Sequence, residues 1–390
     1  MSSAFRFAPR WVATAILGTM AACSSTPLQP PADPVPARPA STATPAATSE
    51  SRAPPAATIE QPRARWIAVS WAELPGWDRD RTAEFWPAFR RSCERPVPVW
   101  LAACASARKA AAGSDASARA WLEQHLQPYR VESPERDASG LATGYFEPLV
   151  EASRAPRPGF RVGLHAPPTD LASRRPYWTR QQLDALPAAQ KSLRGSEIAW
   201  VRDKLDALLL QIQGSGRLAF AGGAGAATQT VRIAFAGHND QPYRSIGRWL
   251  IDEGELRPGE ASWPAIRAWA RQHPQRVDEM LWQNPRVVFF REEPLPDPGV
   301  GPKGAQGVPL TPGRSIAVDP LNVPYGTPVW LDTTEPLSSV PLRRLTVAQD
   351  TGTAITGAVR ADYFWGWGAD AEAQAGRMKQ PLRMWVLWPR

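Results

Sequence analysis

Three aspartates in the C-terminal part of the chain have the types and spacing of an acid–base cluster. Asp319 and Asp350 each follow an apolar segment expected to be a strand, and Asp362 comes 12 residues after Asp350, beyond a Gly-containing turn. Carboxyl groups at strand ends, beside glycines and aromatic residues, suit the proton transfers that break a glycosidic bond. Aspartates at such positions also cap turns by accepting backbone N–H groups, and the local sequence leaves both interpretations open.

Asp362 has the surroundings that best fit a proton donor. It is followed by a stretch of aromatic residues that contains Tyr363, Phe364, Trp365 and Trp367. Apolar neighbours disfavour the ionised carboxylate and raise its pKa, so the group keeps its proton closer to neutral pH. On local grounds Asp362 is therefore the predicted acid.

Other kinds of site are weakly supported. The four histidines are at least 35 residues apart, and none has the spacing of a metal ligand, so no metal is predicted. Gly214-Ser215-Gly216 lacks the Gly-x-Ser-x-Gly pattern of a nucleophilic serine. Lys and Arg outnumber Asp and Glu by 45 to 37, but the longest basic runs are pairs, so nucleic acid is not a predicted partner.

The elements that must position these residues change along the chain from helical to strand-like. Residues 71–129 have helical periodicity, with Ser114 as a predicted N-cap. Short strands with Gly and Pro turns then dominate and predict a small barrel, in a mainly β protein. The predicted strands are 141–150, 160–164, 207–213, 217–220, 230–236, 289–290, 315–318, 328–331, 345–348 and 385–387, with a helical stretch at 243–283.

The N-terminus is typical of an exported lipoprotein. Residues 1–22 have two arginines, an apolar run and small residues before Cys23, which predicts a signal peptide with Cys23 as the acylated residue. Residues 23–65 are rich in Pro, Ala and Ser and predict an extended tether. We expect a lipid anchor at the periplasmic face of a bacterial outer membrane. An ordinary signal peptide with a chance cysteine is the alternative.

Cys93 and Cys104 are the two cysteines that remain after lipidation. They are 11 residues apart, in a stretch that predicts two helices joined by a Pro-containing turn. An exported protein folds in an oxidising compartment, so a disulfide is plausible, with two buried free thiols as the alternative.

Several segments together resemble the membrane-bound lytic murein transglycosylase A family. They are 143–148 (Thr-Gly-Tyr-Phe-Glu-Pro), 211–217 (Gln-Ile-Gln-Gly-Ser-Gly-Arg), 243–247 (Tyr-Arg-Ser-Ile-Gly), 284–285 with 289–290, and 350–362. The last third is similar to the three-aspartate ("3D") domain of that family, and Asp319, Asp350 and Asp362 match its three aspartates. The resemblance extends in order over residues 66–390.

The resemblance implies a fold and a reaction. The fold would be a double-psi β-barrel with N-terminal helices, made of residues 66–155 and 295–390, and an inserted smaller β-domain at 156–294, with a groove between them. The reaction would cleave the bond between N-acetylmuramic acid and N-acetylglucosamine in peptidoglycan without water and leave 1,6-anhydro ends. No cofactor is implied. Glycan strands would be the partner, besides the membrane through the lipid and possible cell-wall synthesis or lysis proteins.

The resemblance also assigns roles to individual residues. Asp362 would be the single catalytic acid and base, Asp350 the supporting carboxylate, and Asp319 structural. Residues expected to hold the sugar are Thr143, Tyr145, Gln213, Ser215, Tyr243, Asp206 and Phe364. Two other functions remain open: a glycoside hydrolase with Asp350 activating water, and a non-catalytic glycan-binding lipoprotein.

Overall fold

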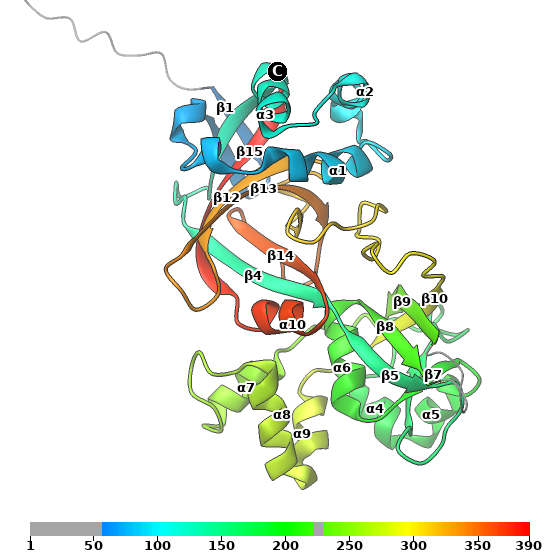
Figure 1. Cartoon of the computed structure of the whole chain (residues 1–390). Coiled ribbons are helices and arrows are strands. Elements are labelled where there is room, and N and C mark those ends of the chain that lie inside the picture. The colour runs from blue at the N-terminus through cyan, green and yellow to red at the C-terminus, as the bar shows by residue number, and fades with distance from the viewer. Residues whose placement is uncertain (1–56, 222–228) are drawn as a thin grey trace, which may run out of the picture. The chain divides into compact units, whose positions relative to one another are not determined.

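The computed structural model describes residues 57–221 and 229–390 (Figure 1). The predicted signal peptide, Cys23 and most of the predicted tether lie outside these ranges. Ordered structure begins at β1 (Thr58–Gln61), which pairs with β2 (Ala64–Ala68), so it starts before the predicted position Trp66. The reason is that Ile59 pairs with the fully buried Trp66, and both contact the core.

Nine strands form the first sheet of the described part of the chain. Besides β1 and β2 they are β3 (Leu126–Glu132), β4 (Gly140–Glu147), β11 (Ser315–Ala317), β12 (Pro328–Thr334), β13 (Pro341–Asp350), β14 (Arg360–Trp367) and β15 (Lys379–Pro389). Their order is β1-β2-β3-β15-β12-β13-β11-β14-β4, and β15 also pairs with β4. That last pairing closes β15, β12, β13, β11, β14 and β4 into a ring.

The ring is filled by alternate residues of its strands. Ile316, Ala361 and Tyr363 are buried in one apolar cluster with Val329 and Met384. Residues between them in sequence, such as Asp362, lie on the other face because successive side chains in a strand alternate. The predicted C-terminal strands at 315–318, 328–331, 345–348 and 385–387 are confirmed.

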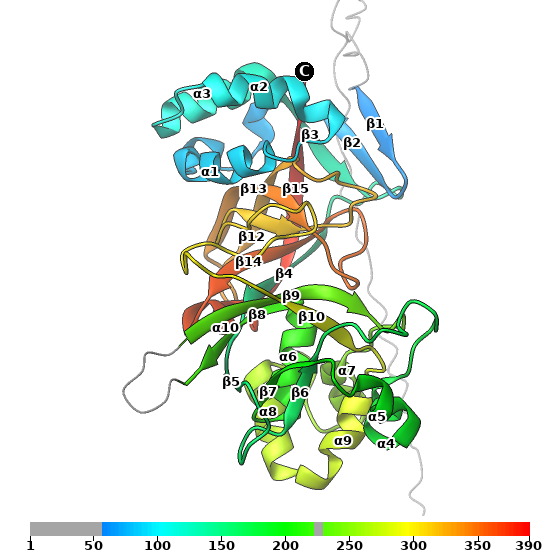
Figure 2. The same cartoon turned by 90° about the vertical axis from the view of Figure 1, so that its right-hand side faces the viewer.

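Three helices precede the ring and pack against it. They are α1 (Thr82–Ser92), α2 (Leu101–Lys109) and α3 (Asp115–His125), as the helical periodicity predicted, although β3 already begins at Leu126. Their aromatic residues share a core with Trp330 and Trp385 of the ring. Ser114 caps α3 by accepting a hydrogen bond from the Ser117 backbone, as predicted. These helices and α10 (Ala369–Ala375) lie at opposite ends of the ring (Figures 1 and 2).

A second sheet lies between β4 and β11 in the sequence. Its strands are β5 (Leu149–Ser153), β6 (Val162–His165), β7 (Glu197–Val201), β8 (Ser215–Phe220), β9 (Gln229–His238) and β10 (Val288–Glu293), in the order β10-β9-β8-β5-β7-β6. The same segment contains α4 (Arg180–Ala185), α5 (Pro187–Leu193), α6 (Lys204–Gln213), α7 (Ile246–Asp252), α8 (Trp263–Gln272) and α9 (Val277–Trp282). The protein therefore mixes helices and sheets, and the expectation of a mainly β chain with a β insert needs correction.

The predicted strand at 207–213 was wrong, because these residues belong to α6. Asp203 caps the helix by accepting from the Asp206 backbone N–H, and Gly214 ends it in the left-handed conformation. Leu205, Leu208 and Leu209 are buried at helical spacing. A short apolar run without its caps does not distinguish a strand from a buried helix.

The chain crosses from the first sheet to the second at Pro148. β4 ends at Glu147 and β5 begins at Leu149, seven residues before the boundary expected after residue 155. Proline has no N–H to donate to a ladder, which suits the point where pairing partners change.

Among the described residues no helix has both the length and the apolarity to cross a membrane.

Candidate active site

Asp350 and Asp362 lie on opposite sides of one short strand. Ala317 of β11 pairs with Asp350 of β13 on one side and with Asp362 of β14 on the other. Neighbouring strands are ~4.8 Å apart, so the two aspartate backbones are about 10 Å apart. Side chains that lean toward each other across β11 come closer than this. The two predicted carboxyl groups are thus brought together by strand pairing rather than by sequence proximity.

Asp362 is half-buried and held by β4. Thr143, its partner in the ladder, donates a hydrogen bond to Asp362 Oδ1 at 2.5 Å, and Arg360 Nη2 donates to the same Thr143 hydroxyl at 2.9 Å. Burial raises the pKa of Asp362 above its ordinary value, while the Thr143 bond and the Arg360 charge oppose the rise. Asp362 therefore holds a proton more tightly than an exposed aspartate does.

Asp350 is fixed by three donors at the end of β13. The backbone N–H groups of Ala305 and Thr351 both donate to Oδ1 at 2.9 Å, and the Tyr145 hydroxyl donates to Oδ2 at 3.0 Å. Burial nevertheless raises the pKa of Asp350 to about 6; the three hydrogen bonds lower it, and the nearby charge of Asp362 adds to the rise. Both carboxyl groups are thus shifted toward neutral pH.

Tyr145 is hydrogen-bonded to Asp350 and lies within the electrostatic influence of both carboxyl groups. Burial and the charges of Asp350 and Asp362 raise the pKa of its hydroxyl well above the ordinary value, so it stays a donor. Its ring packs on Phe364, with ring centroids 5.1 Å apart. Phe364 is fully buried, so its expected contact with a sugar needs correction: it supports the Tyr145 ring from beneath.

Asp319 accepts hydrogen bonds from groups around the turn that precedes Asp362. It accepts from the backbone of Leu321 at 3.1 Å, from the Asn322 side chain at 3.1 Å and from the backbone of Gly357 at 3.0 Å. Gly357 belongs to the turn between Asp350 and Asp362. Asp319 is buried, and its bond from Gly357 joins that turn to the segment that follows β11.

Two of the expected sugar-binding residues line a separate cavity of about 200 Å³. Gln213 and Tyr243 line it with Gly144 and Phe146 of β4, side chains of α6 and α8, and the end of α10. Gln213 Oε1 also accepts from the Phe146 backbone N–H at 3.1 Å. Positions 144 and 146 alternate with Thr143 and Tyr145, so the cavity and the aspartates lie on opposite faces of β4.

Ser215 and Asp206 are not brought to this cavity. Ser215 is half-buried at the start of β8, where it pairs with Ala234. Asp206 lies in the first turn of α6, seven residues or about 10 Å along the helix from Gln213. It accepts a hydrogen bond from Arg267 at 2.7 Å. Burial raises the pKa of Asp206, and Arg267 opposes the rise. The expected groove acid is therefore an ion-paired residue at the far end of α6.

A buried ion cluster that the sequence reasoning missed lies beside β14. Glu147 is fully buried and accepts from Arg217 Nε at 2.8 Å and from Arg232 Nε at 2.5 Å. Arg217 also donates to the Pro298 carbonyl at 2.7 Å and lies over the ring of Trp367, 4.2 Å from its centroid. The cluster joins the second sheet to the strand that carries Asp362.

Arg360 was also missed, although the sequence held a signal for it. It precedes Asp362 by two residues in a strand, and such residues share a face. A charged residue within a segment of apolar and aromatic residues would have pointed to a polar partner.

Groups of three or more His, Cys, Asp or Glu able to hold a metal are absent from residues 57–221 and 229–390. Cys93 and Cys104 form a disulfide.

Comparison with known proteins gives consistent matches. Residues 141–291 match the MltA specific insert domain, and residues 314–388 match the 3D domain. Membrane-bound lytic murein transglycosylase A of Escherichia coli K12 is 31% identical over 268 residues, which cover 67% of this chain and 69% of that protein.

Solved structures agree with these sequence matches. Lytic transglycosylase LtgG of Burkholderia pseudomallei is 45% identical with a TM-score of 0.59, over 86% of this chain and 100% of that one. MltA of Neisseria gonorrhoeae is 30% identical with a TM-score of 0.72, over 86% and 95%. A structure of E. coli MltA with bound chitohexaose is 26% identical with a TM-score of 0.62, over 86% and 95%.

Proposed function

Because the chain belongs to the membrane-bound lytic murein transglycosylase A family, it is a lytic transglycosylase that cleaves peptidoglycan, and we propose that Asp362 is its single catalytic acid and base. One observation carries this assignment. Asp362 is a half-buried carboxyl whose pKa is raised by burial, and its orientation is fixed by the 2.5 Å bond from Thr143. Such a group is protonated before the reaction and can serve as a base after it.

The proposed reaction uses one carboxyl group twice. Protonated Asp362 gives its proton to the oxygen that links N-acetylmuramic acid to N-acetylglucosamine, and that bond breaks as positive charge develops at C1 of the muramic acid. The Asp362 carboxylate then takes the proton of the C6 hydroxyl on the same sugar. The C6 oxygen attacks C1 and closes the 1,6-anhydro ring. Asp362 regains its proton, and water is not consumed.

Asp350 is proposed as the supporting carboxylate. The charge of Asp362 adds to the rise in the pKa of Asp350, so the two carboxyl groups do not readily ionise together. The ionised form of Asp350 is stabilised by the Ala305 and Thr351 backbone groups and by Tyr145. A carboxylate committed to three donors is poorly placed to activate water, which favours the lyase over a hydrolase with Asp350 as base.

The glycan is proposed to contact residues on both faces of β4. Thr143 and Tyr145 flank the aspartates, while Gln213 and Tyr243 line the 200 Å³ cavity. Cavities lined by aromatic rings with a few polar groups suit sugar binding. Ser215, at the start of β8 next to this region in sequence, is kept as a candidate. The chitohexaose bound to the E. coli relative supports an oligosaccharide as the ligand.

We also propose the finer architecture and the location. The closed ring, with parallel pairs β11–β13 and β14–β4, supports a double-psi β-barrel, and the segment from about Pro148 to residue 294 would form a second domain. Residues 1–22 would be the signal peptide and Cys23 the lipidated anchor in the outer membrane. Partner proteins of the cell-wall machinery would then meet the enzyme in the periplasm.

Mass spectrometry of products released from purified peptidoglycan tests the reaction. The purified protein should release muropeptides that are one water lighter than hydrolytic products and have no reducing end. Asp362→Asn should bind strands and release nothing, whereas Asp350→Asn should keep the same products at a reduced rate. Reducing ends would establish a hydrolase, strand binding without any product would establish a glycan-binding protein, and normal cleavage by Asp362→Asn would refute the assignment of the acid.

A further inference from the structure

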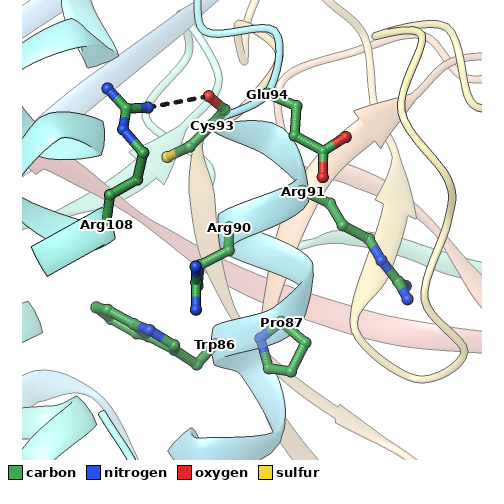
Figure 3. Close-up of a pocket in the computed structure, with 7 residues that line it drawn as sticks. All are labelled: Trp86, Pro87, Arg90, Arg91, Cys93, Glu94 and Arg108. Atoms are coloured by element: carbon green, nitrogen blue, oxygen red, sulfur yellow. Dashed lines mark hydrogen bonds between the residues drawn. The ribbon is translucent and has the colours of Figure 1, made fainter. Parts of the chain in front are cut away.

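A hollow of about 580 Å³ lies at the C-terminal end of α1, away from the site described above. Its lining includes three arginines and one glutamate: Arg90, Arg91, Arg108 and Glu94, with Trp86 and Cys93 in its wall (Figure 3). The net charge of these side chains is positive. A concave surface lined by several arginines suits an anionic ligand.

The disulfide determines which of these arginines converge. Arg90 precedes Cys93 by three residues on α1, and Arg108 follows Cys104 by four residues on α2. Residues three or four apart share a helix face, so each arginine lies on the same face as its cysteine. The bond between the cysteines therefore places both arginines in the wall of the same hollow. Figure 3 shows both on one side of the helix turn, with Arg91 and Glu94 on the other.

Arg90 and Arg108 are left without a carboxylate. Both are exposed, and in the described ranges 57–221 and 229–390 neither forms an ion pair; Arg108 donates only to the Cys93 carbonyl, at 3.4 Å. Arg91, by contrast, donates to Thr311 at 2.7 Å. A guanidinium group binds a carboxylate through two parallel hydrogen bonds, so two free guanidinium groups form a ready site for carboxylates.

A short chain of contacts joins this hollow to Asp350. The Ser92 side chain at the end of α1 hydrogen-bonds Gln306 at 2.9 Å. The Gln306 backbone N–H donates to the Gln349 carbonyl at 3.0 Å, and the neighbouring Ala305 N–H donates to Asp350. The loop containing Ala305 and Gln306 thus contacts α1 on one side and Asp350 on the other.

We propose that Arg90 and Arg108 bind the carboxylates of the peptide that peptidoglycan strands carry. This inference rests on the proposed function, since it assumes that the strand lies at Asp350. The peptide hangs from the muramic acid, the same sugar whose C1 is attacked, and it bears free carboxylate groups. Two guanidinium groups without a carboxylate partner, near the loop that contains Ala305 and Gln306, match that chemistry. The enzyme would then prefer peptide-bearing strands to naked ones.

The kinetic test compares two substrates and two double variants. Strands that carry peptides are compared with strands from the same preparation whose peptides have been removed enzymatically. For Arg90→Gln/Arg108→Gln we expect KM to rise about 5- to 10-fold on peptide-bearing strands and to be unchanged on naked strands, with kcat unchanged on both. The control Lys191→Gln/Arg194→Gln removes two exposed charges from the end of α5 and should change neither KM.

A direct binding measurement separates this proposal from the proposed function. Soluble stem peptide is titrated into the full protein and into both double variants. Loss of peptide binding only in Arg90→Gln/Arg108→Gln supports the site, even if no strand is cleaved and the proposed function fails. Equal binding by all three proteins, no binding by any, or an equal rise of KM on both kinds of strand would overturn it. Binding to vesicles that contain anionic lipid is measured in parallel. If Arg90→Gln/Arg108→Gln loses only this vesicle binding, the proposal is also overturned.

Discussion

Removal of the Thr143 hydroxyl should shift the pH dependence of cleavage upward. Thr143→Val keeps the shape of the side chain but deletes the donor that lies 2.5 Å from Asp362 Oδ1. This donor stabilises the ionised carboxylate and opposes the rise in pKa. A hydrogen bond to a charged group contributes about 1.5–3 kcal/mol. Since 1.36 kcal/mol corresponds to one pKa unit, the pKa of Asp362 should rise by about 1–2 units.

The assay is the pH profile of kcat/KM for release of 1,6-anhydro products. Its basic limb reports the loss of the proton that Asp362 must donate, so that limb should move up by about 1–2 pH units in Thr143→Val. Thr143→Ser keeps the donor and is the matched control, with its limb unmoved. A basic limb at the wild-type pH in Thr143→Val, or one moved equally in both variants, would refute the role of this bond.

The same variant has a stability consequence with a defined sign. Because the folded-state pKa of Asp362 is raised, the folded protein binds this proton more tightly than the unfolded chain. Stability contributed by the protonated form is present below the ordinary aspartate pKa and is lost as pH rises through the folded value. Thr143→Val should therefore be as stable as Thr143→Ser in acid and less stable in alkaline solution, measured by denaturant unfolding.

Three further changes test the surrounding structure. Asp350→Asn removes a carboxyl with a pKa of about 6, so the fall in stability between about pH 4 and pH 6 should weaken; an unchanged unfolding profile would contradict this. Glu147→Gln leaves two buried arginines without an anion and should lower the free energy of unfolding by about 3–5 kcal/mol. An unchanged free energy of unfolding in denaturant would contradict this. Gly144→Ala places a Cβ 2.7 Å from Trp365 Nε1 and should reduce turnover, whereas Gly113→Ala, in open space, should not.

The sequence pointed to Asp362 because its signal is local. Asp362 stands among aromatic residues, and burial by near neighbours is what raises its pKa. The disulfide was also within reach, because Cys93 and Cys104 lie in adjacent predicted helices. The strands at 315–318, 328–331, 345–348 and 385–387 were predicted from local alternation and bounding turns, whereas β14, which carries Asp362, was not predicted as a strand.

The rest of the site depends on contacts between distant residues. The pairing of Ala317 with both aspartates joins three strands, and no spacing along the chain specifies that order. Phe364 was expected to hold the sugar, but its burial depends on the packing of the closed ring of strands. Asp206 was expected to hold the sugar, but it accepts a hydrogen bond from Arg267, which is 61 residues away in the sequence. Side-chain burial and ion pairing at such separations are properties of the folded chain.

β4 explains why the two halves of the site depend on one another. Its residues alternate: Thr143 and Tyr145 contact the aspartates, while Gly144 and Phe146 line the cavity with Gln213. A shift of one residue in its pairing would exchange these two faces. The parallel pairing of Thr143 with Asp362 sets the register at one end, and Glu147, held by two arginines of the second sheet, holds the other end. The strand therefore couples the position of the acid to the cavity where the glycan is proposed to bind.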